Sequence, residues 1–566
     1  MRIRDTFNSA NEPTAATSAA VDDRAGAWLE TTLILLLLAA YAIEPTPSVN
    51  EAHYLGKAKH YWNPSWAAGD LFLESADAHV VFYWTFGWVT RFVSLPAAAW
   101  LGRLLTWSLL AWAWQRLSRA VIPRRWWSVL TAGLFVSLLH WFDMAGEWVI
   151  GGVEAKGFAY VLVLCGLRSL VQNRWSWVWP QFGAAAAFHV LTGGWSVIAA
   201  AIAWAFQRDE RPSLWRQMPW LLLGGALALP GLVPALLLTR DIAPEIVHEA
   251  NRIYVFERLS HHLAFHRLDP AHVSRFAALC IAWSACAYAV RRCERQRRLA
   301  LFVAGALLIA VCGVAIDSLT ANRPDLAASL LRFYWFRLSD FAVPLGTALA
   351  AAGILASSPK PFPNPSRPTH TRTHTRLQPF LHRARPLAIT AAILFTLATI
   401  GSVAARHLQD PRGGADVQSM PAFRRRPEWT HMVYEDWQRT TDWISQHTPP
   451  DAVFLTPRSQ QTFKWNAHRA EVVNWKDMPQ DAATLVEWFE RMRRVYPPTT
   501  ARGEWSEMSD ERLRQLGREY GADYLLLDRT RHRSRPGLKR LFPLEPIDPD
   551  EPDRKSAYEV YSLAEP

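Results

Sequence analysis

Long runs of apolar residues recur through the first three quarters of this 566-residue chain, from Ala27 to Ala405. A segment that crosses lipid must satisfy its own backbone hydrogen bonds, and as a helix it needs about 20 mostly apolar residues. The sequence therefore predicts an α-helical polytopic membrane protein with about eleven transmembrane helices. We expect these spans at Ala27–Ile43, Pro96–Arg116, Trp127–Trp141, Gly157–Val171, Val178–Val190, Gly194–Phe206, Met218–Leu238, Phe276–Val290, Leu299–Ala315, Phe341–Ala356 and Leu387–Ala404.

Two of these segments leave an alternative open. Val178–Val190 and Gly194–Phe206 are short, and they read either as two thin spans or as one helix broken around Gly193. The apolar stretch His79–Phe92 is too short to span comfortably, and it predicts an interfacial or re-entrant helix. The 29 Trp agree with a membrane protein, because Trp favours the membrane–water interface.

Basic residues follow every second predicted span. If the spans alternate in direction, all of these clusters lie on one side, which the positive-inside rule assigns to the cytoplasm. The net charge of +11 is explained in this way, and nothing indicates nucleic-acid binding. We expect the protein to lie in the inner (cytoplasmic) membrane with its N-terminus in the cytoplasm. Residues 44–95, 240–275 and 317–340 are then expected to form long outer loops. The clusters contain Arg116, Arg119, Arg124 and Arg125; Arg168 and Arg174; Arg208, Arg211 and Arg216; Arg291, Arg292, Arg295, Arg297 and Arg298; and the stretch Pro359–Arg385.

The polar ends of the chain differ from this region. Residues 1–26 predict a disordered cytoplasmic tail, residues 27–405 the transmembrane domain, and residues 406–566 an extracytoplasmic α/β domain. The last part contains none of the five Cys, no GxGxxG, no P-loop and no metal-ligand spacing. We interpret it as a lid or recognition module. Its expected helices are Tyr434–Gln446, Ala482–Arg494 and Asp510–Tyr520, and its expected strands are Asp451–Pro457, Ala470–Trp475, Asp523–Asp528 and Ala557–Leu563.

Ionisable residues near the outer ends of the spans are the candidates for chemistry. Carboxylates of the first outer loop can deprotonate an acceptor hydroxyl or hold a divalent metal, and they can equally be ordinary solvated charges. Arginines among aromatic rings suit a lipid phosphate, and they also suit plain anchoring at the headgroups. Ionisable groups near membrane depth tend to be functional. The candidates are Glu51, Asp70 and Asp77; Glu154, Lys156 and His189; Arg258, His261 and His262; and Arg332, Arg337 and Asp340.

The polar, aromatic stretch around residues 457–478 of the C-terminal part is a further candidate. Its side chains can recognise sugar hydroxyls by hydrogen bonding and stacking, or they can form a packed structural surface. They are Gln460, Gln461, Lys464, Trp465, Arg469, Trp475 and Lys476.

The segments "NEAHYL", "GDLFLESADAH", "FHVLTGG" and "RFYWFRLSDF", together with the layout, resemble the GT-C glycosyltransferases. The chain is also similar to a bacterial membrane family of unknown function through "EAKGFAY" and "RFYWFRLSDF". The GT-C resemblance implies a polyprenyl-phosphate-linked sugar donor and a loop carboxylate that acts as base or metal ligand. That carboxylate often lies in an Asp-Glu-x-x-Tyr setting, which reads here as Asn50, Glu51 and Tyr54. Because Asn50 replaces the acid, Glu51 must take its role or the chain is inactive.

These observations predict a glycosyltransferase whose active site lies on the outer face of the membrane. Glu51 is the expected general base, and the lipid phosphate is expected to bind Arg258, Arg332 and Arg337. His261, His262 and Asp340 are expected at the same phosphate, and Tyr54, Asp70, Asp77, Glu154, Lys156 and His189 are expected to support the site. Mg²⁺ or Mn²⁺ stays an option, and the acceptor is unassigned. The alternative is a non-catalytic protein, transporter or flippase on the same scaffold. The sequence argues against a transporter, because it shows no internal repeat and few charges deep in the spans.

Overall fold

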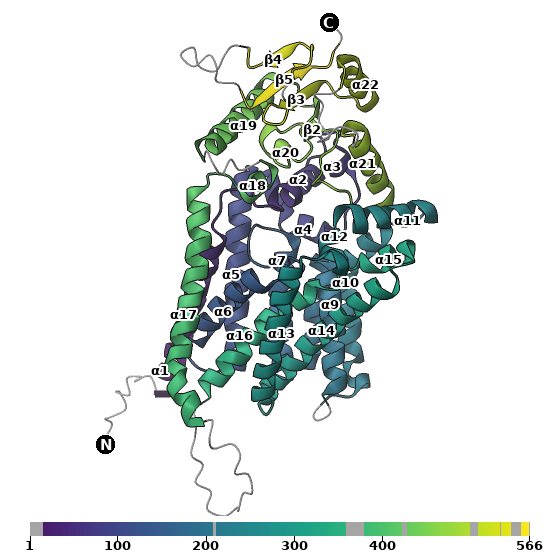
Figure 1. The fold of residues 1–566 in the computed structure, drawn as a ribbon. Coiled ribbons are helices and arrows are strands. Elements are labelled where there is room, and N and C mark those ends of the chain that lie inside the picture. The colour runs from purple at the N-terminus through teal and green to yellow at the C-terminus, as the bar shows by residue number, and fades with distance from the viewer. Residues whose placement is uncertain are drawn as a thin grey trace, which may run out of the picture.

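The computed structural model describes residues 15–207, 211–357, 378–420, 427–497, 508–532, 534–544 and 556–564. Long helices form the lower and middle parts of the molecule, and a small sheet with its own helices lies on top of them (Figure 1). The N-terminus lies at the lower end of the molecule and the C-terminus at the upper end. The predicted division into a helical part and an α/β part therefore corresponds to two regions stacked end to end.

The helical part contains the long helices that the apolar runs predict. They are α1 (Ala15–Ala42), α5 (Leu95–Val121), α6 (Trp127–Phe142), α7 (Ala155–Val171), α8 (Trp175–Phe188), α9 (Val190–Phe206), α10 (Leu214–Leu237), α13 (Pro270–Val290), α14 (Glu294–Leu319), α16 (Arg337–Ala356) and α17 (Gln378–Gln409). Each predicted span falls within one of these helices or extends one or two residues beyond it. Within the described residues, α10, α13, α14, α16 and parts of α1 and α17 are long and apolar enough to cross a membrane by length and composition. The chain is a multi-pass membrane protein.

Two boundaries differ from the expectation. Helix α1 already begins at Ala15, so part of the predicted N-terminal tail is helical, while residues 1–14 lie outside the described residues. The short pair of segments forms two helices, α8 and α9, which meet at His189 and pack against each other. Gly193 permits this contact, because a Cβ there would lie 2.1 Å from the backbone nitrogen of Ala186.

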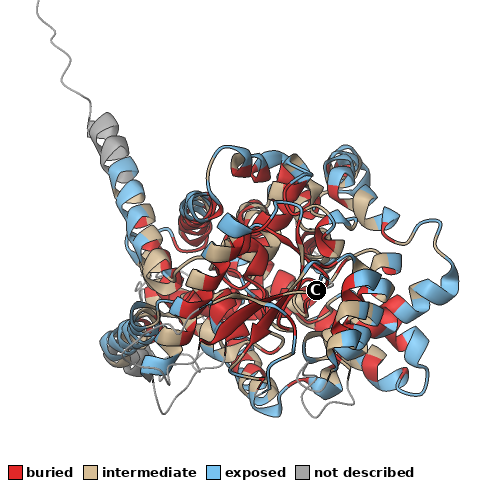
Figure 2. Cartoon of the chain, turned by 90° about the horizontal axis from the view of Figure 1, so that it is seen from above, coloured by how far each residue is buried: buried red, intermediate tan, exposed pale blue. Residues whose placement is uncertain are grey.

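Burial separates a central helix from the outer ones. In α16, 78% of the apolar window is buried within the protein, whereas in α10, α13 and α17 the share is between 11% and 17%. Seen from above, buried residues fill the middle of the molecule and exposed ones its rim (Figure 2). Exposed apolar side chains on a membrane-spanning helix face lipid, so α16 forms the core around which the outer helices pack.

Short helices fill the outer loops. In the first loop they are α2 (Glu51–Trp62), α3 (Leu71–Glu74), α4 (Val80–Thr85) and the 3₁₀ segment η1 (Gly87–Arg91). The predicted single helix over His79–Phe92 is therefore two short pieces. The later loops form α11 (Pro244–Arg252), the π-helical segment η2 (Ile253–Arg258), α12 (Ser260–Leu263), η3 (Phe265–Arg267) and α15 (Pro324–Leu331).

A five-stranded sheet organises the C-terminal part, in the order β2-β1-β3-β5-β4. Strand β1 runs parallel to β2 and β3, with Phe454 opposite Tyr524, and β5 runs antiparallel to β3 and β4. The strands are β1 (Val453–Leu455), β2 (Ala470–Glu471), β3 (Tyr524–Asp528), β4 (Arg540–Phe542) and β5 (Tyr558–Ser562). The helices are α18 (Gly414–Ser419), α19 (Pro427–His447), α20 (Phe463–Ala467), α21 (Ala482–Val495) and α22 (Asp510–Tyr520).

The four expected strands and three expected helices of this part are all confirmed. The sequence did not predict β4, because its three half-buried residues show no alternation of apolar and polar positions. One buried cluster joins the two parts of the protein, since Leu55 and Phe72 of the first outer loop pack with Trp465 and Ala470 of the C-terminal part. The α/β part is therefore fixed onto the outer loops.

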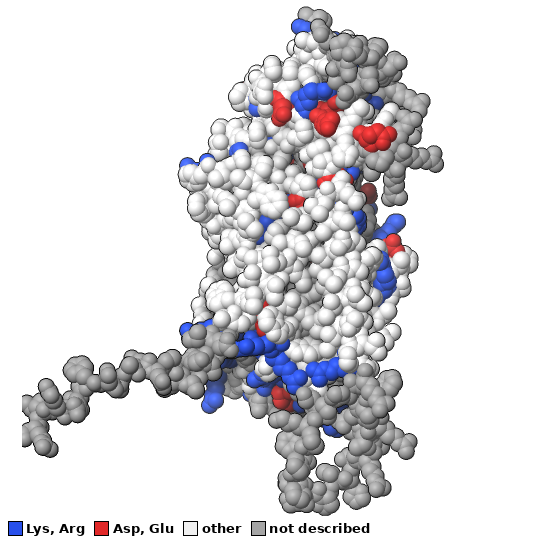
Figure 3. Space-filling view, turned by 90° about the vertical axis from the view of Figure 1, so that its left-hand side faces the viewer, with Lys and Arg blue, Asp and Glu red and all other residues white. Residues whose placement is uncertain are grey.

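Charged side chains gather at the two ends of the molecule. Figure 3 shows a wide band of uncharged atoms, with Lys and Arg concentrated below it and both signs of charge above it. This distribution suits a protein whose middle lies in lipid.

Candidate functional site

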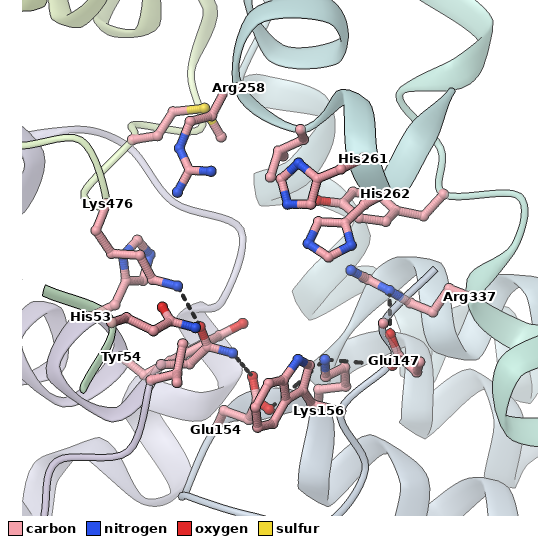
Figure 4. A pocket seen from close by; sticks show the side chains of 18 of the residues that line it. His53, Tyr54, Glu147, Glu154, Lys156, Arg258, His261, His262, Arg337 and Lys476 are labelled. Carbon is pink, nitrogen blue, oxygen red and sulfur yellow. Dashed lines mark hydrogen bonds and ion pairs between the residues drawn. The ribbon is translucent and has the colours of Figure 1, made fainter. Parts of the chain in front are cut away.

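A cavity of about 620 Å³ lies between the helical part and the C-terminal domain. Its walls come from segments that are far apart in the chain, and its lining is rich in ionisable and aromatic side chains (Figure 4). These side chains include Asn50, His53, Tyr54, Glu147, Trp148, Glu154, Lys156, His189, Tyr254, Arg258, His261, His262, Tyr334, Arg337, Gln418, Gln461, Trp475, Lys476 and Gln480. Such a hollow suits a polar ligand.

A chain of polar contacts crosses the cavity. Lys476 Nζ donates to Asn50 Oδ1 at 3.1 Å, and Asn50 Nδ2 donates to Glu154 Oε2 at 3.3 Å. Lys156 Nζ lies 3.8 Å from Glu154 Oε1 and 3.5 Å from Glu147 Oε1. Asn50 can join its two neighbours because an amide both accepts and donates, whereas an aspartate would place a second carboxylate beside Glu154.

At one end of this series of polar contacts, the charges of Glu147, Lys156 and Arg337 neutralise each other in part. Arg337 Nε lies 2.8 Å from Glu147 Oε2, and Lys156 shares the same carboxylate. The Arg337 guanidinium also lies over the Tyr334 ring, 3.8 Å from its centroid. Both Glu147 and Glu154 are therefore engaged by cations.

Arg258 and Lys476 form the other end, where two cations lie near each other. Among the described side chains, neither lies within ion-pair distance of a carboxylate; Arg258 Nε donates to the carbonyl of Trp475 at 3.0 Å. Burial, together with the neighbouring Arg258, lowers the pKa of Lys476 to about 8. Two half-buried cations without a direct ion pair suit an anion, and Arg offers a planar donor fork to phosphate oxygens.

Local structure explains how these side chains reach the cavity. Asn50 precedes helix α2, which presents His53 and Tyr54 to the cavity. Glu154 is the N-cap residue of α7, and Lys156 lies in its first turn. Arg258 ends the π-helical turn η2, a kind of local widening that is frequent at functional sites.

The predicted site residues divide into two groups. Those that line the cavity are Tyr54, Glu154, Lys156, His189, Arg258, His261, His262 and Arg337. His189 Nε2 lies 3.3 Å from Arg337, and His262 Nδ1 donates to the carbonyl of Ala145 at 2.6 Å. Burial lowers the pKa of His262 to about 4, so this ring is neutral at ordinary pH. Eight of the site residues predicted from the sequence therefore line one cavity.

Glu51, the predicted general base, lies outside the cavity. It is fully buried and pairs with Arg103, whose Nε and Nη2 lie 2.7 and 2.6 Å from its two oxygens. The backbone N–H groups of Ser48 and Val153 donate to the same carboxylate. A carboxylate whose oxygens are all engaged in the protein interior has no place for an acceptor hydroxyl, so this assignment needs correction.

Arg332, Asp340, Asp70 and Asp77 also lie outside the cavity. Arg332 donates to Asn251, and Asp340 accepts the backbone N–H groups of Met144 and Ala145. Asp340 thereby holds the loop that carries Glu147.

The two aspartates of the first outer loop are structural as well. Asp70 caps helix α3 and pairs with Lys464 at 3.2 Å. Asp77 pairs with Lys57 at 3.6 Å and with His79 at 2.8 Å. Arg332, Asp340, Asp70 and Asp77 therefore stabilise the structure around the cavity and do not line it.

Other cavity residues escaped the sequence analysis or entered it in another role. Gln461, Trp475 and Lys476 were expected to recognise sugars, and they face the same cavity as the arginines. His53, two residues after Glu51, was missed, although "NEAHYL" already drew attention to this helix. Tyr254 and Tyr334 also line the cavity; the sequence pattern of arginines among aromatic rings does not single out either tyrosine.

The carboxylates of the cavity do not fit a divalent metal. Glu147 and Glu154 both face cationic side chains, and no group of three or more His, Cys, Asp or Glu within the described ranges is arranged to hold an ion.

Comparisons with known proteins add three findings. A family model described as a domain of unknown function, DUF6798, matches residues 435–495. No curated protein matches the chain. Among solved structures, the archaeal oligosaccharyltransferase AglB from Archaeoglobus fulgidus, in complex with an inhibitory peptide and a dolichol-phosphate, is 10% identical with a TM-score of 0.47, covering 89% of this chain and 70% of AglB.

ArnT from Cupriavidus metallidurans, bound to undecaprenyl phosphate, is 12% identical with a TM-score of 0.44. The match covers 97% of this chain and 99% of ArnT. Both proteins are GT-C glycosyltransferases, the class that the sequence resembles.

Proposed function

We propose that this protein transfers a sugar from a polyprenyl-phosphate-linked donor to a hydroxyl acceptor at the outer face of the membrane. The observation that carries the proposal is that one cavity holds two cations without a direct ion pair among the described side chains and a carboxylate at the start of a membrane helix. Arg258 and Lys476 suit the phosphate, and Glu154 suits the acceptor. The cavity lies between the membrane helices and a polar domain, a position that suits a lipid-borne donor and a polar acceptor.

The proposed reaction is a single displacement. The acceptor hydroxyl gives its proton to the Glu154 carboxylate, and its oxygen forms the new bond to the anomeric carbon. The bond from that carbon to the phosphate oxygen breaks, and the phosphate leaves with the electron pair. Arg258 and Lys476 stabilise the charge that develops on the leaving group. The configuration at the anomeric carbon inverts.

The surroundings of Glu154 support its role as the base. Burial raises the pKa of its carboxyl, while Lys156 opposes that rise. A carboxylate with a raised pKa is a stronger proton acceptor near neutral pH than an exposed one. The aromatic ring of Tyr254, which also lines the cavity, is a surface on which a sugar ring can stack.

A transfer assay tests the proposal. The full-length protein is reconstituted in liposomes with radiolabelled undecaprenyl-phosphate hexoses and pentoses and with an extract of cell-envelope glycoconjugates as acceptors. Release of undecaprenyl phosphate is measured. We expect Glu154→Gln to reduce the rate at least about 100-fold, the scale of general base catalysis, while Glu74→Gln, in an exposed residue of the first outer loop, leaves it unchanged.

A second measurement separates binding from chemistry. Native mass spectrometry follows the retention of undecaprenyl phosphate by the same variants. We expect Arg258→Ala and Lys476→Ala to lose the lipid, and Glu154→Gln to keep it. Full transfer by Glu154→Gln would contradict the proposed base. If the wild type retains the lipid but transfers sugar from none of the donors, the non-catalytic or transport alternative would be favoured.

A further inference from the structure

A second cavity, of about 390 Å³, lies at the opposite end of the helical part. It is lined by the middle of α1, the ends of α5 and α7, and the beginning of α14. Five arginines line it: Arg24, Arg116, Arg119, Arg168 and Arg295. Helix α7 connects the two cavities, because Lys156 in its first turn faces one and Arg168 in its last turn faces the other. At 1.5 Å per residue these side chains start about 18 Å apart along the helix.

The charge of this second cavity is only partly compensated. Glu30, fully buried, pairs with Arg119 at 3.1 Å and also accepts from Ser128 and from the backbone of Trp126. Among the described side chains, Arg116, Arg168 and Arg295 have no carboxylate within ion-pair distance; Arg295 donates to the carbonyl of Ala120. Several guanidinium groups around one hollow bind phosphate oxygens better than isolated surface arginines do.

The cavity also faces the hydrocarbon. Trp28 and Trp112 belong to its lining, and both are exposed on the outer side of α1 and α5. The Arg116 guanidinium lies 5.8 Å from the centroid of the Trp112 ring. Helix α1 continues upward with exposed Leu29, Leu33 and Leu36, a surface for acyl chains. Figure 3 shows the basic band directly below the uncharged surface that such chains would cover.

We infer that this arginine cavity binds the phosphate headgroup of an anionic phospholipid from the leaflet opposite the proposed transfer site. A diester phosphate enters among Arg116, Arg168 and Arg295, the tryptophans flank the glycerol region, and the acyl chains lie along α1. Positive charge on this side would by itself attract anionic lipid loosely. The enclosed cavity adds a defined place at which one lipid is held.

Native mass spectrometry on full-length protein released from nanodiscs of equal parts phosphatidylglycerol and phosphatidylcholine tests the inference. We expect the wild type to retain phosphatidylglycerol preferentially. Arg116→Gln with Arg168→Gln should reduce that retention by about fivefold for each arginine removed. The matched control is Arg291→Gln with Arg292→Gln, which removes the same charge from exposed positions outside the cavity, and it should retain the lipid.

The remaining outcomes are also decisive. Because Arg116 is exposed, the single variant Arg116→Gln leaves packing intact and should show the same direction if the double variant misfolds. Equal losses in the cavity and control variants would overturn the inference in favour of general surface charge. Displacement of the lipid by excess inorganic phosphate would overturn it in favour of a soluble ligand. Lys476→Ala should keep this lipid, so the result does not depend on the proposed transfer activity.

Discussion

Glu51 and Glu154 are two carboxylates in contrasting surroundings at the same end of the helical part. Glu51 accepts four donors from Arg103 and the backbone and has no exposed surface. Glu154 faces the cavity and shares its charge with Lys156 and the amide of Asn50. A side chain can act on a ligand only where it has room beside it, so these contacts favour Glu154 over Glu51 as the proposed base.

Substituting Glu51 tests this distinction through stability rather than activity. We expect Glu51→Gln to destabilise the protein by roughly 3 kcal/mol, because it leaves the Arg103 guanidinium buried without a counter-charge. Glu74→Gln, in the same loop but exposed, should be nearly neutral. Thermal unfolding in detergent, followed by size-exclusion chromatography, measures both. A Glu51→Gln protein that is stable as the wild type but inactive would restore Glu51 as the base.

Lys476 gives the anion site a pH dependence. Burial and Arg258 lower its pKa to about 8, so its positive charge is present below that pH and is lost as pH rises through it. A bound anion favours the charged lysine and moves this midpoint upward. We expect undecaprenyl phosphate binding to weaken as pH rises above about 8. Lys476→Arg should bind through the same range without the fall, because arginine stays protonated; identical pH profiles for both proteins would contradict this account.

At the scale of elements, helix contacts depend on small residues where backbones approach closely. Gly193, near the start of α9, faces the backbone of Ala186 in α8, whereas the adjacent Gly194 has open space where a Cβ would be. Without a hydrophobic driving force between helices in lipid, such close approach supplies much of the packing energy. Two neighbouring glycines therefore have different roles.

This pair offers a matched test. We expect Gly193→Ala to lower the stability by about 1–3 kcal/mol, because the added methyl group overlaps backbone atoms that cannot move freely. Gly194→Ala should be neutral or stabilising by about 0.5–1 kcal/mol, since it replaces glycine in a helix. Thermal unfolding of both variants measures the difference. Equal effects would show that α8 and α9 do not pack as described.

The sequence predicts the helices well because the cause lies within each segment. A run such as Leu299–Ala315 has to form a helix wherever it sits in lipid, and the strand Asp523–Asp528 is equally apparent from its own residues. The site depends on contacts that no local pattern contains. Arg103 lies in an apolar run 52 residues after Glu51, and nothing near either residue indicates their pairing. Likewise, Lys476 joins Arg258 only through the docking of the C-terminal domain.

At the scale of the whole molecule, a buried ionic cluster fixes this docking. Lys464 Nζ lies 2.6 Å from both Glu471 and Asp477 and 3.2 Å from Asp70 of the first outer loop. Asp477 also contacts His53, which lines the transfer cavity. One lysine therefore compensates three carboxylates from both parts of the protein.

Lys464→Met should disrupt the docking. We expect a loss of about 3–5 kcal/mol, because three buried carboxylates are left without their cation. Limited proteolysis should then release the C-terminal part faster, while the helical part stays intact in detergent. The matched variant Lys539→Met, in the same domain but away from the outer loops, should behave as the wild type. Unchanged proteolysis of Lys464→Met would show that apolar packing alone holds the parts together.

The ionic cluster around Lys464 has a consequence for how ligands would reach the cavity. Because ion pairs and apolar packing both hold the C-terminal domain on the first outer loop, we expect it to stay in place while ligands exchange. Under the proposed function, the polyprenyl-linked donor would then enter laterally from the membrane, and the polar acceptor along the boundary between the helical part and the C-terminal domain.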